Sequence, residues 1–187
     1  MFVDTNVFYP VRLADLVLSS VDDGLFDLCT SDHLLDEIER VLVNGKGLPA
    51  EKARVFRIAV QANAAVHVDE SQYASLRRRL HGPDADDLWH LAAAITARTD
   101  LIITANVSDF ANADIPPEFQ PVEALDADDF FDRLSRSGLD ADLAATVRRM
   151  AAKLKYPPRS PAQIVDGLEQ IGLAKTVAHL RRHLSES

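Results

Sequence analysis

The sequence predicts an α/β fold, in which a parallel-stranded central sheet is flanked by helices and followed by a C-terminal helical extension. Short apolar runs alternate with segments whose apolar residues recur at helical spacing along residues 1–135. This alternation favours a parallel sheet that is covered on both faces. Near residues 135–140 (SRSGLD) the strand-like runs stop and only helical patterns follow. We therefore predict two domains, residues 1–135 and residues 136–187.

The predicted strands are short and apolar, as expected for strands that are buried on both faces. They lie at residues 1–4 (MFVD), 25–30 (LFDLCT), 65–69 (AVHVD), 101–104 (LIIT) and 121–125 (PVEAL). The run LIIT is the clearest of these. Cys29 lies in the second strand without a basic neighbour in sequence, which indicates a core residue and not a nucleophile.

Helical patterns fill the segments between these strands. They cover residues 10–20, 32–43, 50–63, the segment from Ser71 to about residue 81, residues 86–98 and the segment after Asp126. Pro10 suits a helix start, and Ser31 is placed to cap the second helix. In the helix over 50–63 we predict that the buried face carries Val55, Ile58, Ala59 and Ala62.

The C-terminal segment contains its own helix signals. Residues 156–161 (YPPRSP) form a stiff break, after which Ser160 is placed to cap a helix. Pro161 would be the first helical residue and Gln163 would complete a capping box. Gly172 ends this helix, and a last helix follows with four leucine and valine residues on its inner face: Leu173, Val177, Leu180 and Leu184.

Composition and charge indicate a folded protein with an uneven charge distribution. The 187 residues are 47% hydrophobic and 26% charged, which argues against disorder. The net charge is −9, but residues 141–187 hold eight Lys and Arg against four Asp and Glu, so residues 1–140 carry −13. Acids in the body and bases in the tail suggest a cation site in one and an anionic partner for the other. The alternative is that the tail folds back on the acidic body.

Several features point to the cytoplasm. No apolar run approaches the roughly twenty residues of a membrane helix, so we expect no membrane association. The N-terminus lacks the pattern of a signal peptide. The single cysteine cannot form an internal disulfide, which fits a reducing compartment.

Polar residues follow the apolar runs at the points where the predicted strands end. Asp4 ends the first strand, while Asn106 and Asp109 follow the fourth strand just after Thr104. Because ligands of open α/β sheets bind beyond the carboxyl ends of the strands, these groups should point to one edge. Glu37 lies on the helix after the second strand. An acidic cluster, Asp84, Asp86 and Asp87, opens the helix over 86–98.

Carboxylates that gather in one cleft repel one another unless a cation neutralises them. Oxygen ligands are preferred by the hard cations Mg²⁺ and Mn²⁺. Such ions activate water and offset charge on a leaving oxygen, which is the chemistry of phosphoester hydrolysis. The sequence therefore predicts a Mg²⁺ or Mn²⁺ site.

These stretches resemble the PIN-domain family of ribonucleases, and most closely its VapC-type toxins. The resemblance rests on four blocks in the family's order: MFVDTNVFYP, SDHLLDEIERVL, PDADDLWHLAAAI and LIITANVSDF. Together they span about the first 110 residues, and the tail more loosely resembles an extension found in one branch of these toxins.

The resemblance assigns roles to particular residues. It implies that Asp4, Glu37, Asp87 and Asp109 are the catalytic acids and metal ligands, with Asp84 or Asp86 as alternates to the third acid. Many family members carry Asp at the position of Asn106, so here an amide replaces one charge among the metal ligands.

Other polar residues near these acids receive supporting roles. Thr5, Asn6 and Thr104 are more consistent with hydrogen bonding to the ligands than with metal binding. His90, beside Trp89, is interpreted as structural. The run Arg77 to Arg79 is either a solvated helix face or part of an RNA-binding rim.

The resemblance implies a metal-dependent endoribonuclease, the toxin of a toxin–antitoxin pair. It would hydrolyse a structured RNA such as tRNA or rRNA through a metal-activated water, leaving a 5′-phosphate and a 3′-hydroxyl. An antitoxin partner and a homodimer are further family expectations.

Two alternatives remain open at this stage. One is an RNA- or protein-binding module that cleaves weakly or not at all. The reason to consider it is the amide of Asn106, which replaces an acid. The other is a small-molecule phosphohydrolase of the aspartyl-phosphate type, although that chemistry commonly uses an Asp where this chain has Asn6.

Overall fold

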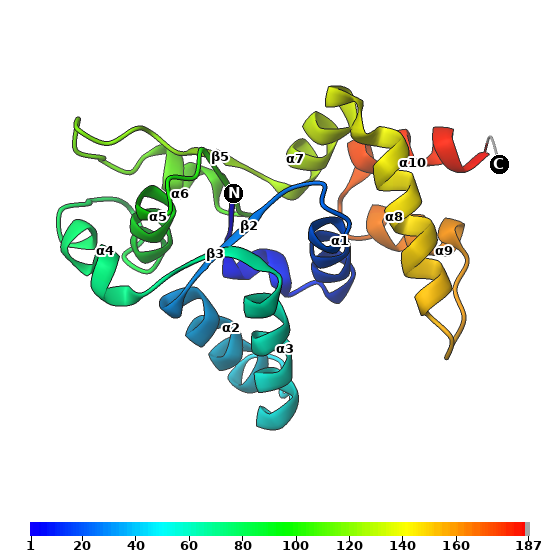
Figure 1. Ribbon diagram of the computed structural model, residues 1–187, viewed down its shortest axis with the longest axis horizontal. Coiled ribbons are helices and arrows are strands. Elements are labelled where there is room, and N and C mark those ends of the chain that lie inside the picture. The colour runs from blue at the N-terminus through cyan, green and yellow to red at the C-terminus, as the bar shows by residue number, and fades with distance from the viewer. Residues whose placement is uncertain (186–187) are drawn as a thin grey trace. The chain divides into compact units, whose positions relative to one another are not determined.

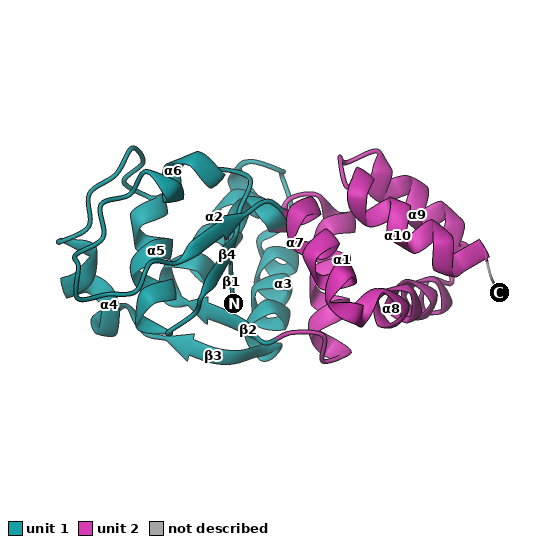
Figure 2. Cartoon of the chain, turned by 90° about the horizontal axis from the view of Figure 1, so that it is seen from above, with its two compact units in different colours: residues 1–7, 27–126 teal, residues 8–26, 127–187 magenta. Residues whose placement is uncertain are grey.

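The computed structural model describes residues 1–185, which form two compact units (Figures 1 and 2). Unit 1 consists of residues 1–7 and 27–126, and unit 2 of residues 8–26 together with the chain from Ala127 onward. The division at residue 135 stays a prediction about domains. As compact units the chain is grouped differently, because residues 8–26 pack with the C-terminal helices.

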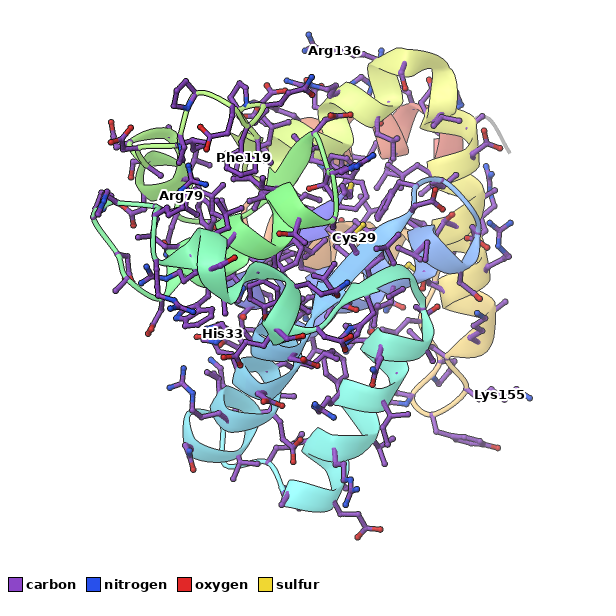
Figure 3. The ribbon with its side chains drawn as sticks, turned by 60° about the vertical axis from the view of Figure 1, so that its left-hand side comes forward. Cys29, His33, Arg79, Phe119, Arg136 and Lys155 are labelled. Carbon is purple, nitrogen blue, oxygen red and sulfur yellow. The ribbon has the colours of Figure 1, made fainter. Side chains whose placement is uncertain are left out.

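Unit 1 is built on five parallel strands. They are β1 (Phe2–Val3), β2 (Leu28–Ser31), β3 (Ala64–Val68), β4 (Leu101–Ile103) and β5 (Glu123–Leu125), in the spatial order β3-β2-β1-β4-β5. The predicted α/β class with a parallel sheet and flanking helices is confirmed, as is the helical C-terminal region. β1, β2 and β4 are buried almost completely, including Cys29, as their apolar runs predicted (Figure 3).

The order of the strands reverses beside β1. The chain proceeds from β1 outward through β2 to β3, and then returns to the other side of β1 with β4 and β5. β1 and β4 pair in parallel, with Val3 opposite Ile103, so their carboxyl ends lie at the same edge. Such a switch point is where open α/β sheets bind ligands.

The helices of unit 1 follow the predicted segments, with one additional short helix after β4. A 3₁₀ turn, η1 (Thr5–Phe8), follows β1; the helices are α2 (Asp32–Asn44), α3 (Ala50–Ala62), α4 (Glu70–Arg77), α5 (Asp87–Thr96) and α6 (Val107–Ala111). Ser31 caps α2 as predicted, because its hydroxyl accepts from Leu34 N at 3.3 Å. α4 begins after Asp69 and not at Ser71, since Asp69 forms a capping box with Gln72.

The predicted inner face of α3 is wrong. Val55 and Ile58 are 63% and 53% exposed, whereas Ala53 and Val60 are fully buried. Residues seven apart lie on one helical stripe, so α3 packs through the narrow stripe of Ala53 and Val60, against α2. The prediction chose the stripe of Val55, Ile58, Ala59 and Ala62, and the packing selected a different stripe.

The elements described in unit 2 are all helices, joined by turns and loops. Its elements are α1 (Val11–Asp22), α7 (Ala127–Leu134), the π-helical segment η2 (Ser135–Leu139), α8 (Asp140–Lys153), α9 (Pro161–Glu169) and α10 (Ala174–Ser185). Gly138 has φ 95° within η2, a left-handed conformation that lets the chain turn between α7 and α8. Phe26 packs edge-on against Phe130 in the core, with ring centroids 5.2 Å apart.

The predicted helix signals of the tail are confirmed. Ser160 and Gln163 form a capping box, Pro161 is the first residue of α9, and Gly172 has the positive φ of 97° that ends the helical run. Leu173, Val177 and Leu180 are buried, and Leu184 is half-buried. None of the helices in residues 1–185 is long and apolar enough to cross a bilayer.

Several basic residues of the tail form ion pairs within unit 2. Arg149 pairs with Asp23, and Lys153 pairs with Asp22 at 3.3 Å. Arg181 contacts both Asp166 and Glu169. These contacts favour the interpretation that part of the positive charge of the tail neutralises acids beside which it folds.

Candidate functional site

Asp4 and Thr104 lie at the carboxyl edge of the sheet, at the switch point between β1 and β4. Asp4 N donates to Ile103 O at 2.8 Å, which continues the strand pairing by one residue beyond β1. Thr104 N donates to Leu125 O at 2.9 Å and continues the pairing between β4 and β5. The sheet therefore fixes the backbone of both residues, and both are buried.

The carboxylate of Asp4 is oriented by neighbouring side chains. Its Oδ2 accepts from Asn6 Nδ2 and from Thr104 Oγ1, each at 2.6 Å. Asn6 is itself held, because its Oδ1 accepts from Ala105 N at 2.9 Å. Asn106 N donates to Thr104 Oγ1 at 3.0 Å. Asn6 and Thr104 thus both donate hydrogen bonds to the carboxylate of Asp4.

Glu37 reaches the same region from α2. Its Oε2 accepts from Thr5 Oγ1 at 2.6 Å and lies 2.8 Å from His90 Nε2. Its Oε1 accepts from Arg40 at 3.1 Å. The interaction with His90, together with the hydrogen bond from Thr5, lowers the pKa of Glu37 to about 2 despite its partial burial. Glu37 is therefore ionised at neutral pH.

His90 joins Glu37 to Asp4, a role that the sequence interpretation missed. The side chain is 1% exposed, and its Nε2 lies 2.8 Å from Glu37 Oε2 and 3.5 Å from Asp4 Oδ1. Burial by itself would lower the pKa of His90, but the bond to Glu37 and the charge of Asp4 raise it. Its position three residues after Asp87 on one helix was the available signal, since that spacing shares a helix face.

Asp87 is the first residue of α5 and is 9% exposed. Among the described residues its buried Oδ2 has no hydrogen-bond partner. Burial, followed by the negative charges of Asp4 and Asp84, raises the pKa of Asp87 to about 6. A buried carboxylate oxygen without a donor is the environment that a cation would complete.

The remaining predicted site residues are more exposed. Asp84 and Asp86 lie before α5, where Asp84 Oδ1 accepts from Asp86 N at 2.8 Å. Asn106 is exposed at the start of α6, and Asp109 is partly buried within that helix. The charge of Asp109 contributes to the raised pKa of Asp87.

The oxygen donors of this cluster fit a hard divalent cation. Asp4 and Glu37 approach one imidazole nitrogen, and Asp87 adds a carboxylate whose charge is disfavoured without a counter-ion. Within residues 1–185, two groups of three side chains hold ligand atoms within 4.8 Å of one another: His33, Glu37 and His90, and separately Asp32, His67 and Asp69. The four acids Asp4, Glu37, Asp87 and Asp109 do not form so compact a group.

His33 was not among the predicted site residues, and the structure places it beside them. It lies at the start of α2, four residues before Glu37 (Figure 3). Its ring stacks on Trp89, with centroids 5.3 Å apart and an interplanar angle of 18°. Burial lowers the pKa of His33, and the neighbouring His90 lowers it further.

The arginine run Arg77–Arg79 contacts the protein itself. Arg77 donates to Ala85 O at 2.7 Å and lies over the Trp89 ring, 5.5 Å from its centroid. Arg79 pairs with Glu118 and lies over Phe119 (Figure 3). Arg78 donates to Ala74 O at 3.2 Å, so all three arginines contact the protein itself.

A five-stranded parallel sheet, with Asp4, Glu37 and His90 in contact at its switch point, defines this chain as an α/β protein with a polar site at the carboxyl edge of the sheet. Two family models match it: the PIN domain over residues 1–108 and the VapC50 C-terminal domain over residues 140–182. Because the first covers more than half of the sequence, the chain belongs to the PIN-domain family, and with the second match to its VapC-type toxins. Comparison with curated proteins and with solved structures gave no match.

Proposed function

We propose that this protein is a metal-dependent endoribonuclease and the toxin of a toxin–antitoxin pair. Membership of the VapC-type PIN family supports nuclease activity. The observation that carries the proposal is the convergence of Asp4 and Glu37 on His90. One helical turn from that histidine lies Asp87, whose buried Oδ2 has no hydrogen-bond partner among the described residues.

In this proposal Asp4, Glu37, Asp87 and Asp109, with Asn106, would hold Mg²⁺ or Mn²⁺. When bound, such an ion lowers the pKa of a water that attacks phosphorus and offsets charge on the leaving oxygen. The amide at Asn106 contributes an oxygen without a charge, which weakens any second metal position more than the first.

The chain's own residues hold the carboxylates in place before an ion arrives. Asn6 and Thr104 orient Asp4, while Thr5 and His90 orient Glu37. Pre-positioned ligands need no reorganisation when an ion binds, which favours both binding and catalysis. The second ring nitrogen of His90 makes no hydrogen bond to any described residue, so the polar contacts of its ring are those of Nε2 with Glu37, Asp4 and Thr5.

The substrate and partners follow from the family and belong to the proposal. We infer a structured RNA of the tRNA or rRNA class as substrate, a small antitoxin protein that covers the site, and a homodimer. An RNA substrate also implies a cytoplasmic location. The apolar residues of α1 are divided between surface and core: Val11 is exposed, whereas Leu13 and Leu16 are buried.

The test is cleavage of purified tRNA and rRNA by the chain in the presence of Mg²⁺ or Mn²⁺. Asp4→Asn should reduce the rate by at least about a hundredfold, because it removes a ligand charge. Asp27→Asn is the matched control, since Asp27 is exposed and its backbone carbonyl, not its carboxylate, accepts from the N-terminus. EDTA should suppress cleavage, and the new 5′ ends should carry phosphate.

Two results would overturn the proposal. One is cleavage that survives Asp4→Asn unchanged, and the other is cleavage that EDTA does not suppress. Binding of RNA by the wild-type chain without any cleavage would instead favour the weakly catalytic or non-catalytic alternative.

A further inference from the structure

Three side chains beside the proposed Mg²⁺ site form a separate group with a different donor set. His33 and Glu37 lie four residues apart on α2 and therefore share one helix face, while His90 comes from α5. One ligand atom from each of the three lies within 4.8 Å of the others. Two helices thus bring two imidazoles and one carboxylate together.

The imidazoles of this group have unused hydrogen-bonding capacity. His33 Nε2 and His90 Nδ1 are both buried, and neither has a hydrogen-bond partner among the described residues. Buried polar atoms without partners are uncommon in folded proteins, because each one loses its bond to water. The His90 side chain is almost completely enclosed, with 1% of its surface exposed.

The rings are also held in place. His33 stacks on Trp89, and its ring meets that of His90 edge-on with centroids 5.3 Å apart. Its backbone N–H donates to the hydroxyl of Tyr73 at 3.2 Å. A metal would therefore find ligands whose conformational freedom is already reduced.

Two imidazoles and a glutamate are a donor set of zinc enzymes, and imidazole favours Zn²⁺ over Mg²⁺. Zinc–ligand distances of about 2.0 to 2.2 Å place tetrahedral ligand atoms roughly 3.4 Å apart. Glu37 Oε2 and His90 Nε2 are already 2.8 Å apart. The ligand atoms of the three residues lie within 4.8 Å of one another, which is near this spacing.

We propose that His33, Glu37 and His90 form a binding site for Zn²⁺, adjacent to the proposed Mg²⁺ site and sharing Glu37 with it. Three protein ligands leave the fourth tetrahedral position open for a water or another small ligand. This site goes beyond the nuclease proposal, because Zn²⁺ binding is a property of the protein alone and is measured without RNA. Its failure and that of the nuclease proposal are therefore separate results.

The experiment is a titration of the metal-free full-length chain with Zn²⁺, followed by calorimetry, with Co²⁺ absorption as a spectroscopic probe of the ligands. His33→Gln should weaken one Zn²⁺ binding event by at least about tenfold to a hundredfold, since it removes one ligand. Glu37→Gln should weaken the same event. Asp27→Asn should leave it in place, because Asp27 is exposed and outside the group.

The matched control is His67→Gln. His67 belongs to the second compact group, with Asp32 and Asp69. Its substitution would remove a competing zinc site and leave the first group unchanged. Loss of Zn²⁺ binding in His67→Gln with retention in His33→Gln would overturn the proposal, as would equal binding by wild type and His33→Gln. Circular dichroism and urea unfolding of His33→Gln separate loss of a ligand from loss of the fold.

Discussion

Replacing Asp87 by Asn should stabilise the metal-free protein at alkaline pH while weakening its response to Mg²⁺. The pKa of Asp87 is raised from 3.8 to about 6 by burial and by neighbouring acids. This difference of about 2 units corresponds to about 3 kcal/mol of unfavourable ionisation in the folded state. The buried amide of Asn needs hydrogen bonds of its own, so we expect a net gain of about 1 to 3 kcal/mol.

The sign of the pH dependence follows from linkage. Below about pH 4 Asp87 is protonated in both states, so its ionisation does not affect stability. As the pH rises from about 4 to about 6, the unfolded chain releases the proton first, and the free energy of unfolding falls. Above about pH 6 the penalty is complete. The stability difference between Asp87→Asn and wild type should therefore grow from near zero at pH 4 to its full value at pH 8.

Urea unfolding in EDTA at pH 4, 6 and 8, followed by the fluorescence of the single Trp89, measures this difference. Trp89 stacks on His33 beside the site, so it reports on this region. Mg²⁺ should then stabilise the wild type and Asp27→Asn alike, but Asp87→Asn much less. A wild type as stable as Asp87→Asn at pH 8 in EDTA would refute the reasoning, because the buried charge would then carry no penalty.

Two further substitutions test the remaining contacts of the site. Thr5→Val removes the hydroxyl that donates to Glu37 Oε2 and should reduce the affinity for Mg²⁺, measured as Mg²⁺-dependent cleavage, about tenfold. Thr5→Ser should retain it, and equal loss in both variants would contradict a role for the hydroxyl. Asn106→Asp adds a carboxylate and should lower the Mg²⁺ concentration for half-maximal cleavage about tenfold, whereas the exposed Asn112→Asp should not. An unchanged or higher requirement in Asn106→Asp would place Asn106 outside the site.

The fold class followed from local patterns because each pattern has a local physical cause. Apolar runs such as LIIT can be buried on both faces only in a covered sheet, and the caps Ser31 and Ser160 satisfy backbone donors within three residues of themselves. These features depend on neighbours along the chain. They were therefore visible in the sequence and are present in the structure.

Predictions about packing were less successful where a residue's partner is distant in sequence. Val55 and Ile58 were placed in the core, yet they are exposed because α3 packs through Ala53 and Val60. A helical stripe shows that a helix has an apolar face, but the neighbouring helix selects which stripe is buried. The start of α4 was missed for a different, local reason: Asp69 and Ser71 are both chemically suitable caps, and Asp69 forms the capping box with Gln72.

At the site, the sequence alone placed Asp4 at the end of a buried strand and other acids after a later strand end and at a helix start. It could do so because strand ends and helix caps are local features. The association of Glu37 with His90 and Thr5, and the place of His33 beside them, depend on how α2 and α5 meet at the reversal of strand order. Burial and charge act through space and not along the chain. For that reason the perturbed pKa values of Glu37 and Asp87, and the role of His90, emerged only once the chain was folded.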